Sequence, residues 1–165
     1  LAFRSGLFVI SYLYMKRKIL ALIFTVLLVF ASYLPSVFAQ ELYTTEKLIT
    51  VDIGKQMVFA WEGGKIVYQT KASTGMKYTP TIKGDLRIKN KVAMQDMKGY
   101  YPPYEPYFIK NVPNVMYFYG AYAIHGAHWH NKFGQRVTHG CVNVPVAASE
   151  WLFNWADYGT RVVVF

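Results

Sequence analysis

Cysteine occurs only once in this sequence, at Cys141, so the chain cannot form an internal disulfide. Because no second cysteine lies near residue 39, a lipid-bearing cysteine anchor is also excluded. Acidic residues are few. All nine of them, but only 14 of the 18 lysines and arginines, lie in residues 40–165, which therefore carry a net charge of +5. This charge suits an anionic partner, such as the peptide carboxylates of a cell wall or a nucleic acid.

Long runs of like charge, internal repeats and low-complexity segments are missing from the sequence. No run reaches five like charges, so we interpret the lysines mainly as a solvated surface. A length of 165 residues is enough for one domain with a sizeable core, and nothing indicates a second one. The chain is therefore expected to contain one folded domain, preceded by a segment of a different kind.

The first 39 residues have the pattern of an export segment. A basic cluster at residues 15–18 precedes an apolar run, Ile19 to Leu34, and Val37-Phe38-Ala39 offers small residues to a signal peptidase. We predict a signal peptide at residues 1–39 with cleavage after Ala39, and a mature domain at 40–165. An uncleaved membrane anchor is the alternative, although sixteen apolar residues fall short of the ~20 that a spanning helix needs. Export argues against a nucleic-acid partner.

The start of the chain leaves one question open. Residues 1–14 form a second apolar block before the basic cluster, and the first residue is leucine, so Met15 is an alternative start. Either way, the only contact with a membrane expected from this sequence is through residues 15–39, if they are not cleaved.

The remainder of the chain is predicted to be mainly β. Segments rich in β-branched and aromatic residues are separated by glycine-containing turns, of which residues 62–65 form a clear hairpin signal. A single helix is expected to open at Val144-Pro145-Val146-Ala147, to place Trp151, Leu152 and Trp155 on one face, and to end at Gly159. The predicted strands are 48–53, 56–61, 66–72, 107–109, 115–119, 121–124 and 161–165.

Residues 89–104 show little periodicity and contain the cluster Tyr100-Tyr101-Pro102-Pro103-Tyr104. We predict a long loop here. Long loops in compact domains are often functional, so this aromatic, proline-containing segment could wall a substrate groove, or it could be ordinary surface packing.

The chemistry is expected at Thr138-His139-Gly140-Cys141-Val142-Asn143. All four histidines of the chain (His125, His128, His130 and His139) fall within sixteen residues of Cys141. A nearby imidazole is the usual means of activating a thiol, and it predicts a thiol pKa below the free value. Glycine before the nucleophile leaves room for backbone N–H groups to bind an oxyanion. A lone cysteine is often just a small buried hydrophobic residue, but an unpaired cysteine is unusual in an exported protein and therefore suggests a function. The stretch therefore indicates a cysteine acyl-transfer site.

These motifs resemble those of the L,D-transpeptidase (YkuD-like) catalytic domain. The resemblance rests on Ile124-His125-Gly126, the gap that follows, and Thr138 to Asn143. It extends over about residues 47–165 and implies the β-sandwich of that family, with one short helix after the catalytic cysteine. Further similarity lies in residues 73–75, 79–81, 83–88, 129–131 and 133–134.

The resemblance also implies roles at the site. Cys141 would be the nucleophile and His125 its base, with the ring of His125 oriented by the backbone carbonyl of Gly126. The N–H groups of Gly140 and Cys141 would bind the oxyanion, and His139 would support the site. One departure concerns the arginine that one subgroup of the family usually has directly before Ser/Thr-His-Gly-Cys: here Val137 occupies that position and Arg136 lies one residue earlier. The expected substrate-binding residues are Asn143, Arg136 and Tyr107.

By the same resemblance the protein is a cysteine-dependent acyltransferase of the cell envelope. It would attack peptidoglycan stem peptides, form a thioester with a donor tetrapeptide, and pass the acyl group to an acceptor amine as a 3→3 cross-link. No metal or organic cofactor is implied, and a monomer is expected. Transfer to water, which would make it an L,D-carboxypeptidase, and a catalytically silent wall-binding module are the alternatives.

A metal hydrolase is the alternative from another enzyme class. The four histidines and Cys141 are side chains of the type that bind zinc. However, no carboxylate lies in the stretch to act as a base, and the histidine spacing matches no familiar zinc signature.

Overall fold

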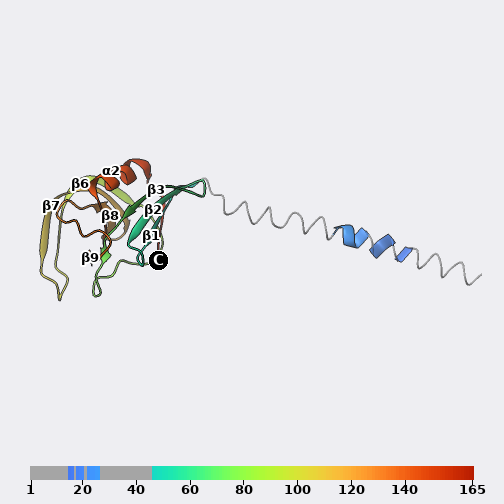
Figure 1. Cartoon of the computed structure of the whole chain (residues 1–165), viewed down its shortest axis with the longest axis horizontal. Coiled ribbons are helices and arrows are strands. Elements are labelled where there is room, and N and C mark those ends of the chain that lie inside the picture. Colours follow the sequence, from blue (N-terminus) through green and yellow to red (C-terminus); the bar gives the residue numbers. More distant parts are fainter. Residues whose placement is uncertain (1–14, 17, 21, 27–45) are drawn as a thin grey trace, which may run out of the picture. The chain divides into compact units, whose positions relative to one another are not determined.

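The computed structural model describes residues 15–16, 18–20, 22–26 and 46–165 (Figure 1). The chain divides into two units, Leu1–Tyr43 and Thr44–Phe165, each of which is described by itself. In the first unit the described residues are helical, and no described helix is both long enough and apolar enough to cross a membrane. The predicted cleavage site after Ala39 and the boundary at residue 40 lie outside the described residues.

The second unit is built on a five-stranded sheet with the order β3-β2-β1-β11-β5. Its central strands β1 and β11 pair in parallel, and every other neighbouring pair is antiparallel. Alternation along β1 turns Ile49 and Val51 into the core, where both are fully buried. The strands are β1 (Leu48–Asp52), β2 (Met57–Glu62), β3 (Lys65–Lys71), β5 (Gly84–Arg87) and β11 (Arg161–Val164).

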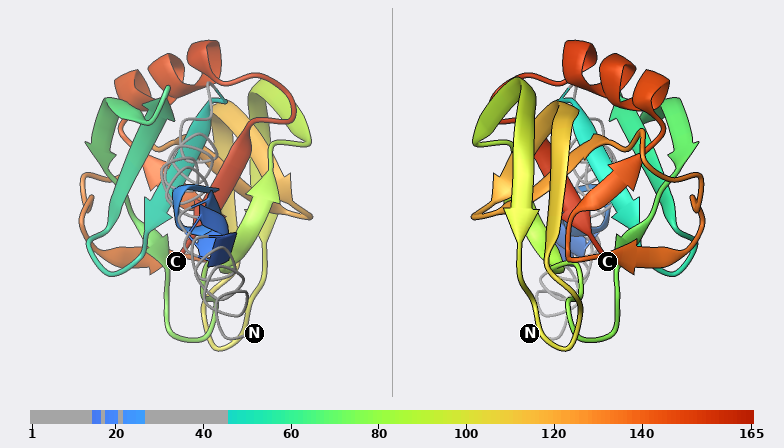
Figure 2. Two further views of the ribbon diagram at one scale, coloured as in Figure 1. Left: turned by 90° about the vertical axis from the view of Figure 1, so that its right-hand side faces the viewer. Right: turned by 90° about the vertical axis from the view of Figure 1, so that its left-hand side faces the viewer.

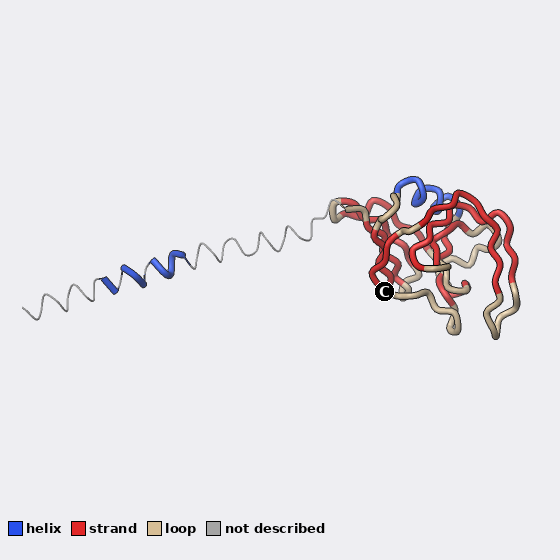
Figure 3. The backbone as a smooth tube through the Cα atoms, turned by 180° about the vertical axis from the view of Figure 1, so that it is seen from behind, coloured by secondary structure: helices blue, strands red, loops and turns tan. Residues whose placement is uncertain are grey.

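A four-stranded sheet with the order β10-β8-β7-β6 lies on the other side of this core (Figure 2). Phe118, Met116 and Ile124 of this sheet pack with Ile49 and Val51 of the first. Strands β4 and β9 form a further two-stranded pair. Figure 3 shows that much of this unit is strand. The strands are β6 (Asn90–Gly99), β7 (Tyr107–Tyr119), β8 (Tyr122–Gly126), β10 (Val142–Val144), β4 (Thr74–Gly75) and β9 (Arg136–Thr138). The predicted mainly-β sandwich with one short helix after the cysteine is confirmed.

The loop predicted at residues 89–104 is wrong for most of its length. Residues 90–99 form strand β6, and β7 is one strand of 13 residues, where the sequence suggested two. The two strands make a long hairpin whose pairing shifts between Gln95 and Met97, while Asn111 and Asn114 of β7 have positive φ. These irregularities break the alternation of apolar and polar residues, which is why the sequence pattern does not show the strands.

The helix α2 (Val146–Trp155) follows β10 directly and packs against β7 and β8. Figure 2 shows it across one end of the sheets. It ends earlier than predicted, because Ala156 is extended, and Gly159 (φ +83°) instead lies in the turn before β11. Lys91 Nζ donates hydrogen bonds of 2.6 Å to the carbonyls of Phe153 and Ala156, so a lysine from β6 caps the last turn.

Candidate active site

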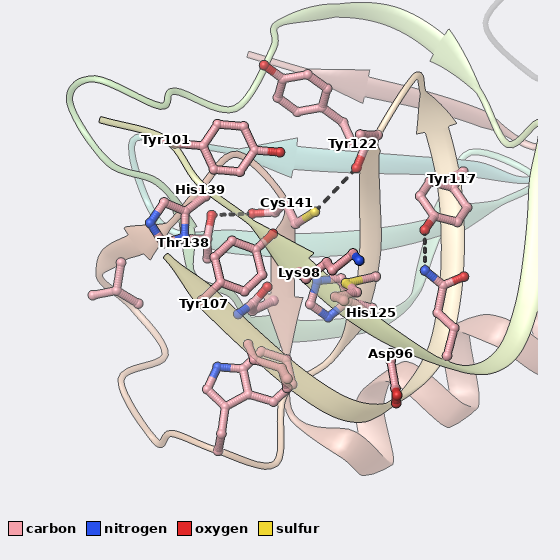
Figure 4. Close-up of a pocket in the computed structure, with 17 residues that line it drawn as sticks. Asp96, Lys98, Tyr101, Tyr107, Tyr117, Tyr122, His125, Thr138, His139 and Cys141 are labelled. Carbon is pink, nitrogen blue, oxygen red and sulfur yellow. Dashed lines mark hydrogen bonds between the residues drawn. The ribbon is translucent and has the colours of Figure 1, made fainter. Parts of the chain in front are cut away.

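A cavity of about 720 Å³ lies beside the beginning of β10. Its lining includes Cys141, His125, His139, Asn143 and Tyr107. His125 comes from β8, His139 and Cys141 from the segment entering β10, Asn143 from β10 itself and Tyr107 from β7 (Figure 4). The parallel pairing of β10 with β8 sets His125 opposite Asn143. Tertiary pairing of two strands thus brings together residues that lie sixteen or more positions apart in the chain.

Gly140 shapes the backbone just before the nucleophile. Its φ is +118°, a value that L side chains rarely adopt, and an added Cβ would lie 2.7 Å from Cε1 of Tyr122. The side chain of Thr138 holds the same turn: its Oγ1 accepts the N–H of Gly140 at 3.1 Å and donates to the carbonyl of Cys141 at 2.6 Å. The N–H of Gly140, one of the two expected oxyanion donors, therefore already has a partner.

The Cys141 thiol is half-buried and its hydrogen bond runs to the backbone. Sγ lies 3.6 Å from the carbonyl oxygen of Ala121, to which it donates. Burial raises the pKa of Cys141 to about 11, although the backbone N–H of Ala123 bonds to the sulfur and opposes this rise. The expectation of a lowered thiol pKa is therefore wrong for the resting site, because desolvation outweighs the stabilisation of the thiolate.

His125 is neutral and carries its ring proton on Nδ1, the nitrogen that is hydrogen-bonded to the backbone. The side chain is 2% exposed, and its Nδ1 lies 3.1 Å from the carbonyl oxygen of Gly126. A carbonyl can only accept, so Nδ1 bears the hydrogen and Nε2 keeps a free lone pair. Burial lowers the pKa of His125 to about 4; the Gly126 carbonyl works against this shift, and the nearby His130 adds to it. Such a tautomer can take a proton during a reaction.

His139 is enclosed by tyrosines of the β6–β7 hairpin and the loop between its strands. Its ring stacks on Tyr107 (centroids 4.9 Å apart, 12° between planes) and Tyr101 (5.6 Å, 23°), and meets the ring of Tyr104 edge-on (5.4 Å, 75°). Burial lowers the pKa of His139, and its Nε2 finds no hydrogen-bond partner among the described residues. Burial, and next the charge of a nearby Cys141 thiolate, raise the pKa of Tyr107 to about 12. The position of His139 therefore depends on aromatic packing.

The expected substrate-binding residues occupy different places. Tyr107 and Asn143 line the cavity, whereas Arg136 is exposed on β9 and its neighbour Val137 faces the cavity. The sequence predicted no individual role for Thr138, and it placed Tyr101 only in a segment that could wall a substrate groove; Tyr101 does line the cavity. A hydroxyl three residues before the nucleophile is a recognisable signal for a side chain that fixes a turn. The tyrosine and proline cluster gave a weaker one.

Other cavity residues had no predicted role of their own. Trp129, whose ring centroid lies 5.8 Å from that of His125, belongs to a segment that contributes only to the family resemblance. Gln95, Asp96 and Lys98 come from β6, which the sequence analysis expected to be loop. Their assignment to the cavity depends on the hairpin, which the sequence pattern did not indicate.

The histidines expected as alternative metal ligands are engaged elsewhere. His128 Nε2 lies 3.1 Å from the carbonyl oxygen of Lys110, and His130 Nε2 lies 3.0 Å from the side-chain amide of Asn143. Among the described residues, no group of three or more histidine, cysteine, aspartate or glutamate side chains is placed to hold a metal ion.

Several solved structures share this fold. An L,D-transpeptidase from Mycobacterium smegmatis is 24% identical (TM-score 0.68; 73% of this chain and 58% of that one). A cysteine-to-serine mutant of the Enterococcus faecium L,D-transpeptidase is 28% identical (0.66; 73% and 50%). An L,D-transpeptidase in complex with imipenem is 20% identical (0.67; 72% and 58%). The chain thus covers half to three fifths of their lengths. No curated protein gives a significant match.

The sequence also matches a family model over nearly all of the second unit. The model is that of the L,D-transpeptidase catalytic domain, and the match covers residues 46–164. That span contains both sheets, α2 and every residue of the cavity. The chain belongs to the L,D-transpeptidase family.

Proposed function

We propose that this protein is a peptidoglycan L,D-transpeptidase that works through a thioester on Cys141. The observation that carries the proposal is the placement of His125 on β8 and of Cys141 directly before the neighbouring strand β10, where both line one cavity. The neutral thiol supplies a nucleophile, and the neutral imidazole with a free Nε2 supplies a base. Two such groups facing one cavity are what acyl transfer from a peptide requires.

The acylation step begins with both groups uncharged. His125 Nε2 removes the thiol proton as Sγ bonds to the carbonyl carbon of the third stem-peptide residue at its L-centre. The C–N bond to the terminal D-residue then breaks, and His125 returns the proton to the departing amine. The carbonyl oxygen carries the negative charge meanwhile. The Cys141 N–H is proposed to stabilise it, joined by the Gly140 N–H if this group leaves Thr138 Oγ1.

The second step transfers the acyl group. An amine of a neighbouring stem peptide attacks the thioester carbon, His125 takes its extra proton, and the Cys141 thiol leaves with a proton from the imidazolium. The product is a 3→3 cross-link, and the free enzyme is restored. His139, stacked on Tyr107, is proposed to support the walls of the site without itself moving a proton. Asn143, Arg136 and Tyr107 are proposed to bind the substrate.

The substrate class implies a place of action. L,D-transpeptidases act on peptidoglycan, so we propose that this protein is exported and works as a monomer in the cell envelope, held to a membrane only if residues 15–39 are retained. The net charge of +5 on residues 40–165 suits a wall rich in peptide carboxylates. No cofactor enters the proposed reaction.

Transfer of the acyl group to water, instead of an amine, would make the protein an L,D-carboxypeptidase. Both outcomes share the thioester and differ only in the acceptor. A silent wall-binding module would have the same cavity without forming an acyl enzyme.

Intact-mass measurement tests the nucleophile. The protein should gain the mass of one imipenem molecule, the compound bound in one of the similar structures, and Cys141→Ala should gain none. Both Cys141→Ala and Cys141→Ser should lose turnover yet melt within a few degrees of the wild type. An alanine variant that still cross-links stem peptides would contradict the mechanism. Digestion of a donor tetrapeptide with and without an amine acceptor then separates transfer from hydrolysis, and a wild type that forms no adduct would indicate the binding module.

A further inference from the structure

Asn143 is a buried polar side chain whose hydrogen bonds are incomplete. It is 4% exposed, and one end of its amide lies 3.0 Å from His130 Nε2. The other end, placed as Oδ1, is buried and has no partner among the described residues, and Asn143 is one of the residues that line the cavity. Leaving a buried polar atom unpaired costs about 1–3 kcal/mol, so the orientation of this amide matters.

The position of the ring hydrogen on His130 decides which end of the Asn143 side-chain amide lies against the ring. The backbone N–H of Lys132 donates to His130 Nδ1 at 3.1 Å, so Nδ1 must be the unprotonated nitrogen. Neutral imidazole then carries its hydrogen on Nε2, and an imidazolium would set two donors against each other at Nδ1. Burial, and next the nearby Lys132, lower the pKa of His130, in keeping with the neutral ring. The Nε2–H group needs an acceptor, which only the Oδ1 end of Asn143 can provide.

We infer that His130 is a positioning residue: its Nε2–H holds Oδ1 of Asn143, and this turns the Asn143 NH2 group into the cavity as a donor for the substrate. A half-turn of the amide about its Cβ–Cγ bond gives this arrangement, because its two ends have nearly the same shape. The orphaned position is then occupied by a donor that awaits an acceptor oxygen. His130 itself does not touch the substrate.

The surroundings hold this arrangement in place. Asn143 and Ser73 exchange two backbone hydrogen bonds of 2.8 Å, and Ser73 Oγ donates to the carbonyl of Lys132, also at 2.8 Å. The His130 ring packs between Trp129 (5.9 Å, 82°) and Phe133 (5.2 Å, 45°). The loop that carries His130 and the strand that carries Asn143 are therefore both hydrogen-bonded to Ser73, which fixes them relative to each other.

The ligand atom follows from the donor. An NH2 group recognises an acceptor oxygen, either a peptide carbonyl or a carboxylate. Asn143 lies two residues after Cys141, so this oxygen would bind about 7 Å along the strand from the nucleophile. Resting on the proposed function, the ligand is an oxygen of the acyl-donor stem peptide next to the scissile bond. This contact would contribute to substrate binding and not to proton transfer.

Nitrogen NMR of the full chain tests the tautomer independently of any activity. In ¹⁵N-labelled protein, His130 should show a protonated Nε2 and an unprotonated Nδ1. A protonated Nδ1 would overturn the inference. Because this measurement needs no substrate, its result stands even if the proposed function fails.

Binding of a donor tetrapeptide to the Cys141→Ala protein tests the role of Asn143. The peptide should shift the side-chain NH2 resonances of Asn143. In that background His130→Phe, which keeps an aromatic ring but loses the donor, should weaken the affinity about tenfold, the value of one hydrogen bond. His130→Gln, which restores a donor, should recover most of it. His128→Phe is the matched control, since His128 contacts Lys110 and lies outside the cavity lining, and it should leave the affinity unchanged.

Coupling between the two residues completes the test. With Cys141 intact, His130→Phe and Asn143→Ala should each raise KM with little change in kcat, and the double variant should cost no more than Asn143→Ala alone. Additive effects of the two substitutions would overturn the positioning role. A wild type that binds no stem peptide would refute the proposed function and the named ligand, while the tautomer would still decide how His130 holds Asn143.

Discussion

Replacing His125 by alanine should slow acylation of Cys141 by about 10²–10⁴-fold at pH 7 and make the remaining rate strongly dependent on pH. The structure gives the reason. The pKa of the thiol is raised to about 11 and that of the imidazole is lowered to about 4, both by burial. Near neutral pH both groups are uncharged, and without a base only roughly one thiol in 10⁴ would be ionised.

A preformed thiolate–imidazolium pair is too costly for the resting enzyme. Burial raises the pKa of the thiol and lowers the pKa of the imidazole, so both shifts oppose transfer of the proton from Cys141 to His125 in the resting site. The neutral pair therefore prevails, and His125 must act as a general base during the attack itself.

The assay is the rate of imipenem acylation, followed by mass spectrometry, across the pH range. The wild-type rate should be nearly constant between about pH 5 and pH 10, because His125 is unprotonated and Cys141 is protonated throughout. In His125→Ala the rate should rise about tenfold per pH unit as the thiolate population grows, and high pH should restore part of the activity. Thermal melts of both proteins would check that the fold survives.

His139→Ala is the matched control. It should lower the rate through disturbed packing against Tyr107 and yet keep the flat profile. A wild-type rate that climbs between pH 6 and pH 8 and levels off below the free thiol value of about 8.5 would contradict general-base catalysis by His125, since it would reveal a stabilised thiolate. If His139→Ala shows the steep profile and His125→Ala does not, the roles of the two histidines are reversed.

Three further predictions concern packing, metal and processing. Gly126→Ala should lower the free energy of unfolding by about 1–3 kcal/mol, because the new Cβ would lie 2.5 Å from Ser149 Oγ and 2.9 Å from Pro113 Cγ; an unchanged denaturant midpoint would argue against this close packing. Chelators should leave acylation intact, whereas stoichiometric zinc by elemental analysis, with activity lost on its removal, would favour the metal hydrolase. N-terminal sequencing of protein from its native host should find Gln40, and a membrane-bound chain that starts at Met15 would mean an anchor.

The sequence alone indicated the fold class and the centre of the site. Runs of β-branched residues between glycine turns reflect local preferences of the backbone, so β1, β2, β3 and β11 were predicted close to their observed bounds. The motif from Thr138 to Asn143 is equally local, since its residues are neighbours in the chain. The gathering of all four histidines near the single cysteine pointed to the same place.

Tertiary structure decided what depends on contacts between distant segments. The sequence did not predict the hairpin of β6 and β7, because bulges and positive-φ asparagines break the alternation of apolar and polar residues. The stacking of Tyr101 on His139 depends on this hairpin and was therefore not predicted either. The pKa of Cys141 was misjudged because burial beside distant strands raises it, a desolvation that no spacing reveals. The hydrogen bond between His130 and Asn143 arises in the same way, because a loop and a strand meet only when both are fixed to Ser73. Backbone preferences depend on each residue and its neighbours in the chain, whereas the burial of a side chain and its hydrogen-bond partners are set only once the chain has folded.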